Sequence, residues 1–105
     1  MDRARFESGL TLEEFLDTAS AQDRDALNDG LKSSEMLVRE KLGQPQPASS
    51  PVYLYAAAEP WCIDTKINLP VAAALARIMG TVILRCHTRE ASTDLGVERI
   101  PTFIF

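Results

Sequence analysis

The stretch that decides the fold is VYLYAAAEPWCIDTKINLP, residues 52–70. Its first six residues, Val52 to Ala57, form a short apolar run that suits a buried strand. A helical pattern follows from Ile63 to Met79, and Gly80 is placed to end that helix. Its spacing puts four apolar residues on one side: Ile67, Val71, Leu75 and Ile78. The sequence therefore predicts a strand joined by a short loop to a helix, with Cys62 at the helix start.

Two further strands are expected downstream. Residues 81–86 form the second strand, and a helical turn over Ala91 to Leu95 leads to a third, antiparallel strand over Ile100 to Phe105. A strand–helix–strand unit of this length implies parallel strands with a right-handed crossover. The Cys62 and Cys86 regions should then lie at the same edge of the sheet.

An acidic helical arm is expected before this unit, over residues 1–42. Thr11 to Glu14 read TLEE, the form of a capping box, which predicts a helix from about Leu12. Later apolar residues continue the helical spacing, so two helices or one interrupted helix fill the arm. Residues 43–51, GQPQPASSP, form the linker to the domain over residues 52–105.

Composition excludes several function classes. The chain has 105 residues, a net charge of −4 and no basic stripe, which argues against nucleic-acid binding. The charged N-terminus lacks a signal-like apolar stretch, and no apolar run suits a membrane span, so we expect a cytoplasmic protein without a membrane partner. Two cysteines and one histidine are too few for a disulfide scaffold or an all-Cys/His zinc site. No metal or cofactor is expected, and thiol chemistry remains.

Cys62 is the candidate nucleophile. Unpaired N–H groups and the positive end of the dipole at a helix start favour a thiolate there, as does Lys66 one turn further on. Asp64 opposes this, because a nearby carboxylate disfavours a second negative charge. The alternative is that Cys62 is simply a small buried apolar residue.

These residues resemble the thioredoxin superfamily, whose active site reads Trp-Cys-x-x-Cys-Lys. The resemblance rests on Trp61-Cys62, Lys66, Pro70, Gly96-Val97 and Ile100-Pro101-Thr102. It implies an α/β thioredoxin-like fold, with a cis peptide bond before Pro101 in a loop beside Cys62. That loop and Trp61 would bind an extended substrate. Residues 59–64 and the helical arm look similar to a bacterial branch with a Trp-Cys-x-Asp motif.

The sequence departs from the dithiol pattern at the position of the second cysteine. Thr65 stands there, so the resemblance implies a thiol–disulfide oxidoreductase that acts through Cys62 alone, in a Cys-x-x-Thr motif. Ala56 replaces the family's buried acid. The chain ends at Phe105, where the family would complete a hairpin and a last helix. We therefore expect a sheet lacking these elements, in which either the domain is truncated or the arm or another copy covers the open edge. The isolated chain should self-associate through this edge or be unstable alone.

Several residues keep two interpretations. Asp64 is a helix N-terminal charge or a proton relay, and Thr65 fills the first turn or hydrogen-bonds the Cys62 thiolate. Cys86 fills the core or acts as a resolving thiol. His87 is a surface residue or one whose hydrogen bonds are satisfied, or it acts as a general base. The expected partners are protein or low-molecular-weight thiols and disulfides.

Two alternative functions stay open. The chain can be a redox-inactive thioredoxin-like binding module, in which Trp61, Ile100 and Pro101 grip an extended peptide. A weaker alternative is iron–sulfur binding through Cys62 with glutathione, by analogy with monothiol glutaredoxins, which carry Ser where this chain has Thr65.

Overall fold

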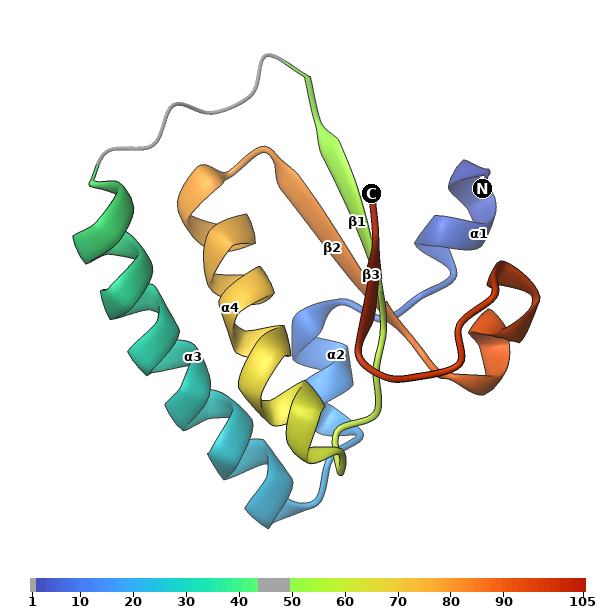
Figure 1. Ribbon diagram of the computed structural model, residues 1–105, viewed down its shortest axis with the longest axis horizontal. Helices are drawn as coiled ribbons and strands as arrows, with labels where there is room; N and C mark the ends of the chain where they lie inside the picture. The colour runs from blue at the N-terminus through green and yellow to red at the C-terminus, as the bar shows by residue number, and fades with distance from the viewer. Residues whose placement is uncertain (1, 44–49) are drawn as a thin grey trace.

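The computed structural model describes residues 2–43 and 50–105 (Figure 1). The helices are α1 (Arg3–Glu7), α2 (Leu12–Asp17), α3 (Ala21–Leu42), α4 (Ile63–Met79) and the 3₁₀ helix η1 (Glu90–Leu95). The strands are β1 (Val52–Ala57), β2 (Val82–His87) and β3 (Thr102–Ile104). None of these helices is both long and apolar enough to cross a membrane.

The strands form one sheet in the order β2-β1-β3. β1 runs parallel to β2, with Val52 opposite Val82, and antiparallel to β3, with Ala57 opposite Thr102. Helix α4 makes the crossover between β1 and β2. The α/β fold class and the strand order expected from the sequence are confirmed, although β3 is shorter than the expected strand.

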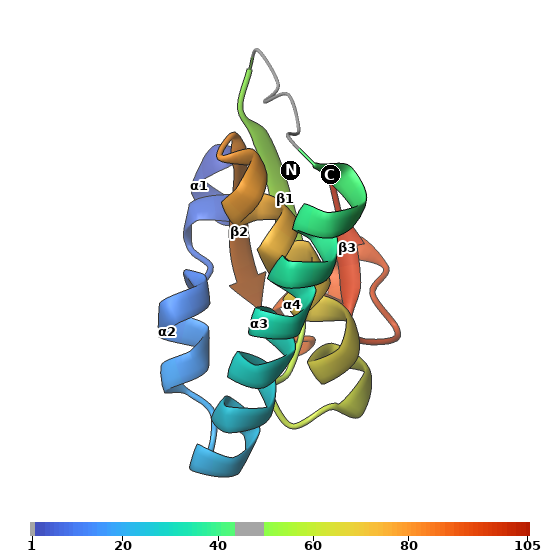
Figure 2. The same ribbon diagram turned by 90° about the vertical axis from the view of Figure 1, so that its left-hand side faces the viewer.

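The two faces of the sheet carry separate cores because side chains alternate along a strand. Leu54 and Ala56 face the cluster that contains the buried residues of α2, α3 and α4. Tyr55 and Ala57 face a smaller cluster that includes Phe6 of α1. Figures 1 and 2 show α3 as an outer layer over α4, with α1 and η1 on the other side of the sheet.

Helix α4 buries only part of the side that its sequence spacing predicts, because Leu75 and Ile78 pack against the core while two other residues of that side lie exposed. Ile67, Val71, Leu75 and Ile78 share one side by helical spacing, yet the side chains of Ile67 and Val71 are 61% and 41% exposed. The buried residues of the helix are Thr65, Leu69, Pro70, Ala73 and Ala74. Small residues allow this packing: a Cβ added to Gly30 of α3 would lie 3.0 Å from Pro70 Cγ.

The arm contains three helices, one more than the sequence predicts. The expected capping box is confirmed, because the Thr11 and Glu14 side chains accept from each other's backbone N–H groups. Between α1 and α2, Leu10 pairs with Cys86, with backbone N–O distances of 2.8 and 2.7 Å. The arm therefore covers the outer edge of β2. Residues 44–49 of the expected linker lie outside the described residues.

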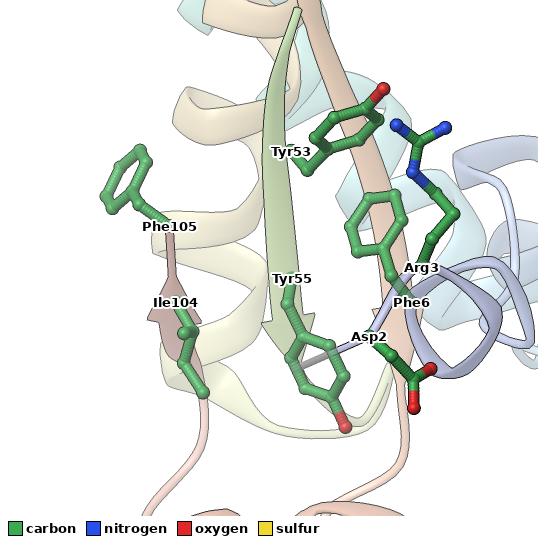
Figure 3. A pocket seen from close by; sticks show the side chains of 7 residues that line it. All are labelled: Asp2, Arg3, Phe6, Tyr53, Tyr55, Ile104 and Phe105. Carbon is green, nitrogen blue, oxygen red and sulfur yellow. The ribbon is translucent and has the colours of Figure 1, made fainter.

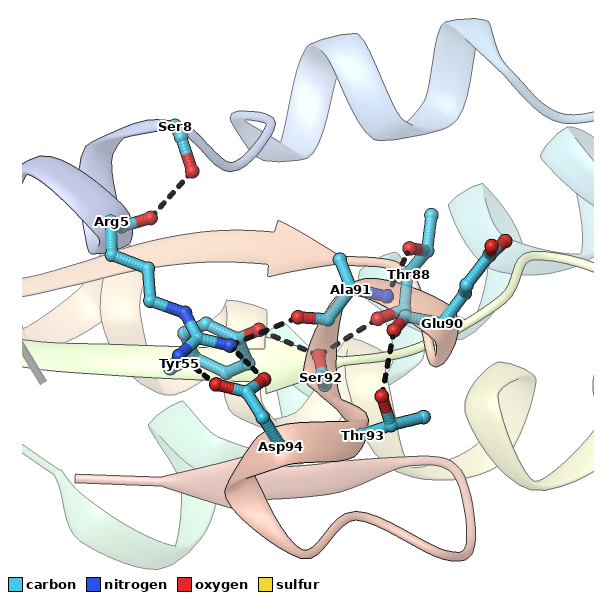
Figure 4. Close-up of polar contacts among 9 residues, drawn as sticks. All are labelled: Arg5, Ser8, Tyr55, Thr88, Glu90, Ala91, Ser92, Thr93 and Asp94. Carbon is cyan, nitrogen blue, oxygen red and sulfur yellow. Dashed lines mark hydrogen bonds and ion pairs between the residues drawn. The ribbon is translucent and has the colours of Figure 1, made fainter.

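Helix α1 is held against η1 by an ion pair (Figure 4). The Arg5 guanidinium donates two hydrogen bonds to the Asp94 carboxylate and a third, of 3.0 Å, to the Ala91 carbonyl. The pKa of Asp94 is lowered, first by the hydrogen bond from Arg5. Below this pair, the Tyr55 and Ser92 hydroxyls lie 2.6 Å apart. These contacts join the start of the arm to the segment that follows β2.

The outer edge of β3 remains open within the described part of the chain. β3 pairs there with β1 alone, and β1 lies in the centre of the sheet. Phe105 follows this strand with an 87% exposed side chain. The arm thus covers the β2 edge and leaves the β3 edge available.

Candidate functional site

Cys62 lies at the carboxyl end of β1, as the residue that caps the start of α4. β3 begins opposite the last residue of β1, so the segment before β3 reaches this same end of the sheet. As a result, the half-buried Cys62 thiol donates to the Ile100 carbonyl oxygen across 3.8 Å. The Ile100–Pro101 peptide bond is cis. The structure thus brings Cys62 together with the Ile100–Pro101 loop.

The charges beside Cys62 differ from those expected. The Cys62 side chain makes no capping hydrogen bond to the first turn of α4. Lys66 Nζ lies 2.5 Å from Asp23 Oδ1 of α3, and both side chains are three-quarters buried or more. The pKa of Asp23 is lowered, first by this bond. Lys66 is therefore an ion-pair partner of the arm, and its positive charge is shared with Asp23 rather than directed at the thiol alone.

Thr65 is completely buried, although it follows Cys62 by only three residues. Its side chain is 0% exposed, and its hydroxyl has no hydrogen-bond partner among the described residues. Of the two interpretations of Thr65, the structure has the one in which it fills the first turn, and the alternative hydrogen bond to the Cys62 sulfur is not formed. Asp64 lies exposed in the first turn of α4, where a negative charge stabilises the helix start.

Cys86 and His87 are part of the packed interior. Both cysteines are free thiols, and Cys86 is 1% exposed. Burial raises the pKa of the Cys86 thiol to about 12, so it is neutral at physiological pH. The His87 ring stacks on Tyr55 at 3.8 Å, and its Nε2 donates to the Phe6 carbonyl across 3.1 Å. Burial favours a core-filling role for Cys86 over that of a resolving thiol. The contacts of His87 favour a hydrogen-bonded structural role over that of a general base.

Exposed apolar residues flank Cys62 in the chain. Trp61 is 65% exposed, Ile63 is 71% exposed, and Ile67 follows one turn later on α4. Exposed apolar side chains that gather in one place mark sites that bind other molecules. The sequence predicted Trp61 as part of a binding surface, whereas the helical spacing of Ile67 suggested a core residue.

Two of the cavities in the described part of the chain border helix α1 or the loop before Cys62. One of about 250 Å³ lies between α1 and the strands β1 and β3 (Figure 3) and contains none of the residues predicted to act. The other, of about 500 Å³, separates the arm from the loop that ends at Trp61. The described residues hold no group of three or more side chains suited to a metal ion.

Comparison with known proteins agrees with this geometry. A family model described as thioredoxin matches residues 9–105. The chain belongs to this thioredoxin family. The match includes α2 and α3 of the arm as well as the segment that carries Cys62. A search of curated proteins gave no match.

Two solved structures are similar to this thioredoxin-family chain. A protein of unknown function from Pseudomonas aeruginosa has a TM-score of 0.78 and 22% identity, over 99% of this chain and 69% of that chain. An HIV epitope-scaffold has a TM-score of 0.77 with the same identity and coverage. At this identity the likeness shows the fold, including its N-terminal helices, and carries no activity with it.

Proposed function

We propose that this thioredoxin-family chain is a thiol–disulfide oxidoreductase that acts through Cys62 alone. The observation that carries the proposal is the 3.8 Å contact between the Cys62 sulfur and the Ile100 carbonyl. It joins a half-exposed thiol at a helix start to a loop with free surface for a substrate. Helix starts favour the thiolate, which is the reactive form in disulfide exchange.

The reaction proceeds as three exchanges at one sulfur. The Cys62 thiolate attacks one sulfur of a substrate disulfide, forms a mixed disulfide, and releases the other substrate sulfur as a thiolate. A glutathione thiolate then attacks the Cys62 sulfur and releases the remaining substrate thiolate. A second glutathione restores the Cys62 thiolate and leaves as oxidised glutathione. One substrate disulfide is reduced while two glutathione molecules are oxidised.

An external thiol fits the residues around Cys62 better than an internal one. Thr65 has no sulfur, and Cys86 is a buried neutral thiol. Reduced glutathione is abundant in the cytoplasm, where we place the protein. We also propose that it belongs to a bacterial branch with a Trp-Cys-x-Asp motif, in which Asp64 assists proton transfer near the thiol.

The test is reduction of insulin disulfides by the purified chain with glutathione as the reductant. Cys62→Ser should lose all activity above the glutathione background. Cys86→Ser should keep its rate within about twofold, because a thiol with so high a pKa contributes little thiolate. Activity that survives in Cys62→Ser would refute the mechanism, and loss in a folded Cys86→Ser variant would assign the resolving step to Cys86.

A second candidate function is peptide binding without redox chemistry. The exposed side chains of Trp61, Ile63 and Ile67 favour it, because they form an apolar surface that needs no thiol to act. Unfolded casein with blocked thiols is a suitable probe. In a pure binding module, Cys62→Ser would bind casein as the wild type does, Trp61→Ala would lose binding, and neither variant nor the wild type would reduce insulin.

A further inference from the structure

A cavity of about 500 Å³ opens beside the residues that lead to Cys62. One wall comes from the arm and includes Leu10 and Phe15. The opposite wall includes Pro60 and Trp61, and Cys86 of β2 also lines the cavity. Its volume falls in the range of ~300–1,000 Å³ that ligand sites occupy. Trp61, which lines the cavity, directly precedes Cys62 in the chain, and Cys86 and His87 end β2, so the cavity and Cys62 lie at the same end of the sheet.

The wall from the arm is held close to the sheet by specific contacts. Leu10 exchanges two backbone hydrogen bonds with Cys86, of 2.8 and 2.7 Å. Beside it, Gly9 lies directly over the His87 ring, where a Cβ would fall 2.2 Å from Nε2. Glycine is therefore required at this point, since any larger residue would push the arm away. The arm approaches closely and still leaves a cavity open.

The lining residues select for an apolar, uncharged group. Leu10, Phe15, Pro60 and Trp61 supply apolar surface, and Glu59 is the one carboxylate among the residues that line the cavity. The Glu59 carboxylate also accepts a hydrogen bond from the Arg89 backbone N–H. An anionic group would be repelled by Glu59 and would find no lysine or arginine on the walls.

We propose that this cavity binds an apolar side chain of the substrate polypeptide, beside the disulfide that Cys62 attacks. This inference rests on the proposed function and adds the class of substrate. The N-terminal arm then acts as a specificity element, because it forms one wall of the cavity. Substrates with aromatic or long aliphatic residues near the disulfide are preferred over those with acidic residues.

The first experiment measures binding without any thiol chemistry. The probe is N-phenyl-1-naphthylamine, a neutral aromatic compound, added to the Cys62→Ser chain. Trp61 is the single tryptophan of the sequence, so its fluorescence reports energy transfer to a probe bound beside it. The proposal predicts saturable quenching of Trp61.

Variants then locate the bound probe. Ala91→Phe fills the cavity from its exposed rim, and Ala26→Phe adds the same ring to an exposed position of α3 that does not line the cavity. Ala91→Phe should weaken probe binding at least about tenfold, a loss of ~1.4 kcal/mol, whereas Ala26→Phe should bind like the parent. Thr18→Phe fills the cavity from the arm and replaces Ala91→Phe if that variant fails to fold. If a folded variant with a filled cavity binds the probe as tightly as Ala26→Phe does, the proposal is overturned.

The second experiment uses the wild-type chain and separates this inference from the proposed function. The probes are two mixed disulfides of 5-thio-2-nitrobenzoate, one with a phenylbutyl group and one with a carboxybutyl group. Rates are divided by those of free glutathione with the same probes. Cys62 should prefer the phenylbutyl probe about tenfold, and Ala91→Phe should remove most of this preference. Equal normalised rates with the two probes would refute binding in the cavity but leave the proposed function standing. No reaction of Cys62 with either probe would refute the proposed function.

Discussion

The Cys62 sulfur lies 3.8 Å from the Ile100 carbonyl oxygen, although 38 residues separate the two in the chain. Two structural features produce this contact. β1 delivers Cys62 to the carboxyl end of the sheet, and the antiparallel β3 starts at that same end. A nucleophile and a loop with backbone groups available to a substrate thus meet without any contribution from the arm. The arm adds the Asp23–Lys66 ion pair and the cavity beside Trp61.

Replacing Thr65 by cysteine should convert the site into a dithiol site. Thr65 lies in the first turn of α4, three residues after Cys62, a spacing at which two cysteines can form a disulfide. On oxidation, Thr65→Cys should form a disulfide between Cys62 and the introduced thiol, and the reduced variant should reduce one insulin disulfide per chain without glutathione, because the introduced thiol resolves the mixed disulfide. Thr65→Val is the matched control and should still depend on glutathione. A Thr65→Cys chain that keeps two free thiols at these positions after oxidation would contradict this geometry.

The buried hydroxyl of Thr65 should cost stability. It has no hydrogen-bond partner in the described part of the chain, and such a group costs about 1–3 kcal/mol. Thr65→Val keeps the shape and should raise the free energy of unfolding in urea by about 1 kcal/mol. Thr18→Val is the control, because the Thr18 hydroxyl donates to the Phe15 carbonyl and its removal should bring no gain. A lower stability of Thr65→Val would show that the hydroxyl has a partner in solution.

Stability should depend on pH through His87, the single histidine of the sequence. Burial lowers the pKa of His87 below the ordinary value of 6.5. The unfolded chain therefore binds this proton more readily than the folded chain. The contribution of His87 is full above pH 6.5 and is lost as the pH falls through the folded pKa. Urea unfolding measured from about pH 7.5 downward should show this loss below the unfolded pKa of ~6.5.

His87→Phe is the variant that checks this assignment. It keeps a ring over Gly9 and against Tyr55 but has no titrating group. Its stability should change much less with pH over the same range, even if its stability near neutral pH is lower through loss of the hydrogen bond to Phe6. An equal pH dependence in wild type and variant would place the titrating group elsewhere.

Self-association through the outer edge of β3 stays a prediction. β3 has no second strand partner among the described residues, the neighbouring Phe105 is 87% exposed, and residues 103–105 include no charged side chain. Light scattering should give a mass that rises with concentration. Phe105→Lys should shift the equilibrium toward monomer, because a charge at a strand edge discourages pairing. A concentration-independent monomer for the wild-type chain would show that this edge does not self-associate.

Much of the fold could be predicted because its signals are local. The run at Val52–Ala57 and the helical pattern ending at Gly80 correspond to β1 and α4, and Gly80 adopts the left-handed conformation expected of a helix stop, with φ of 71°. The capping box fixed the start of α2 in the same way. These features depend on a few adjacent residues and not on what packs around them.

The rest depends on contacts between distant segments. Helix α3, whose Gly30 permits close approach, packs against Pro70 of α4, and Ile67 and Val71 of α4 remain exposed. The pairing of Leu10 with Cys86 involves one residue of the arm and leaves no periodic pattern in the sequence. Cys62 and Pro101 were predictable from the family resemblance, whereas the cavity that the arm forms beside Trp61 was not.

The central claim is that the fold makes Cys62 a reactive nucleophile, and one rate comparison tests it most directly. The chain is Cys86→Ser, so that Cys62 is the single thiol, and the reagent is oxidised glutathione. The rate of mixed-disulfide formation is measured for the native chain and for the same chain unfolded in urea at the same pH. The account predicts that the native chain reacts at least about tenfold faster, because its thiol lies at a helix start. A native rate equal to or below the unfolded rate would contradict it.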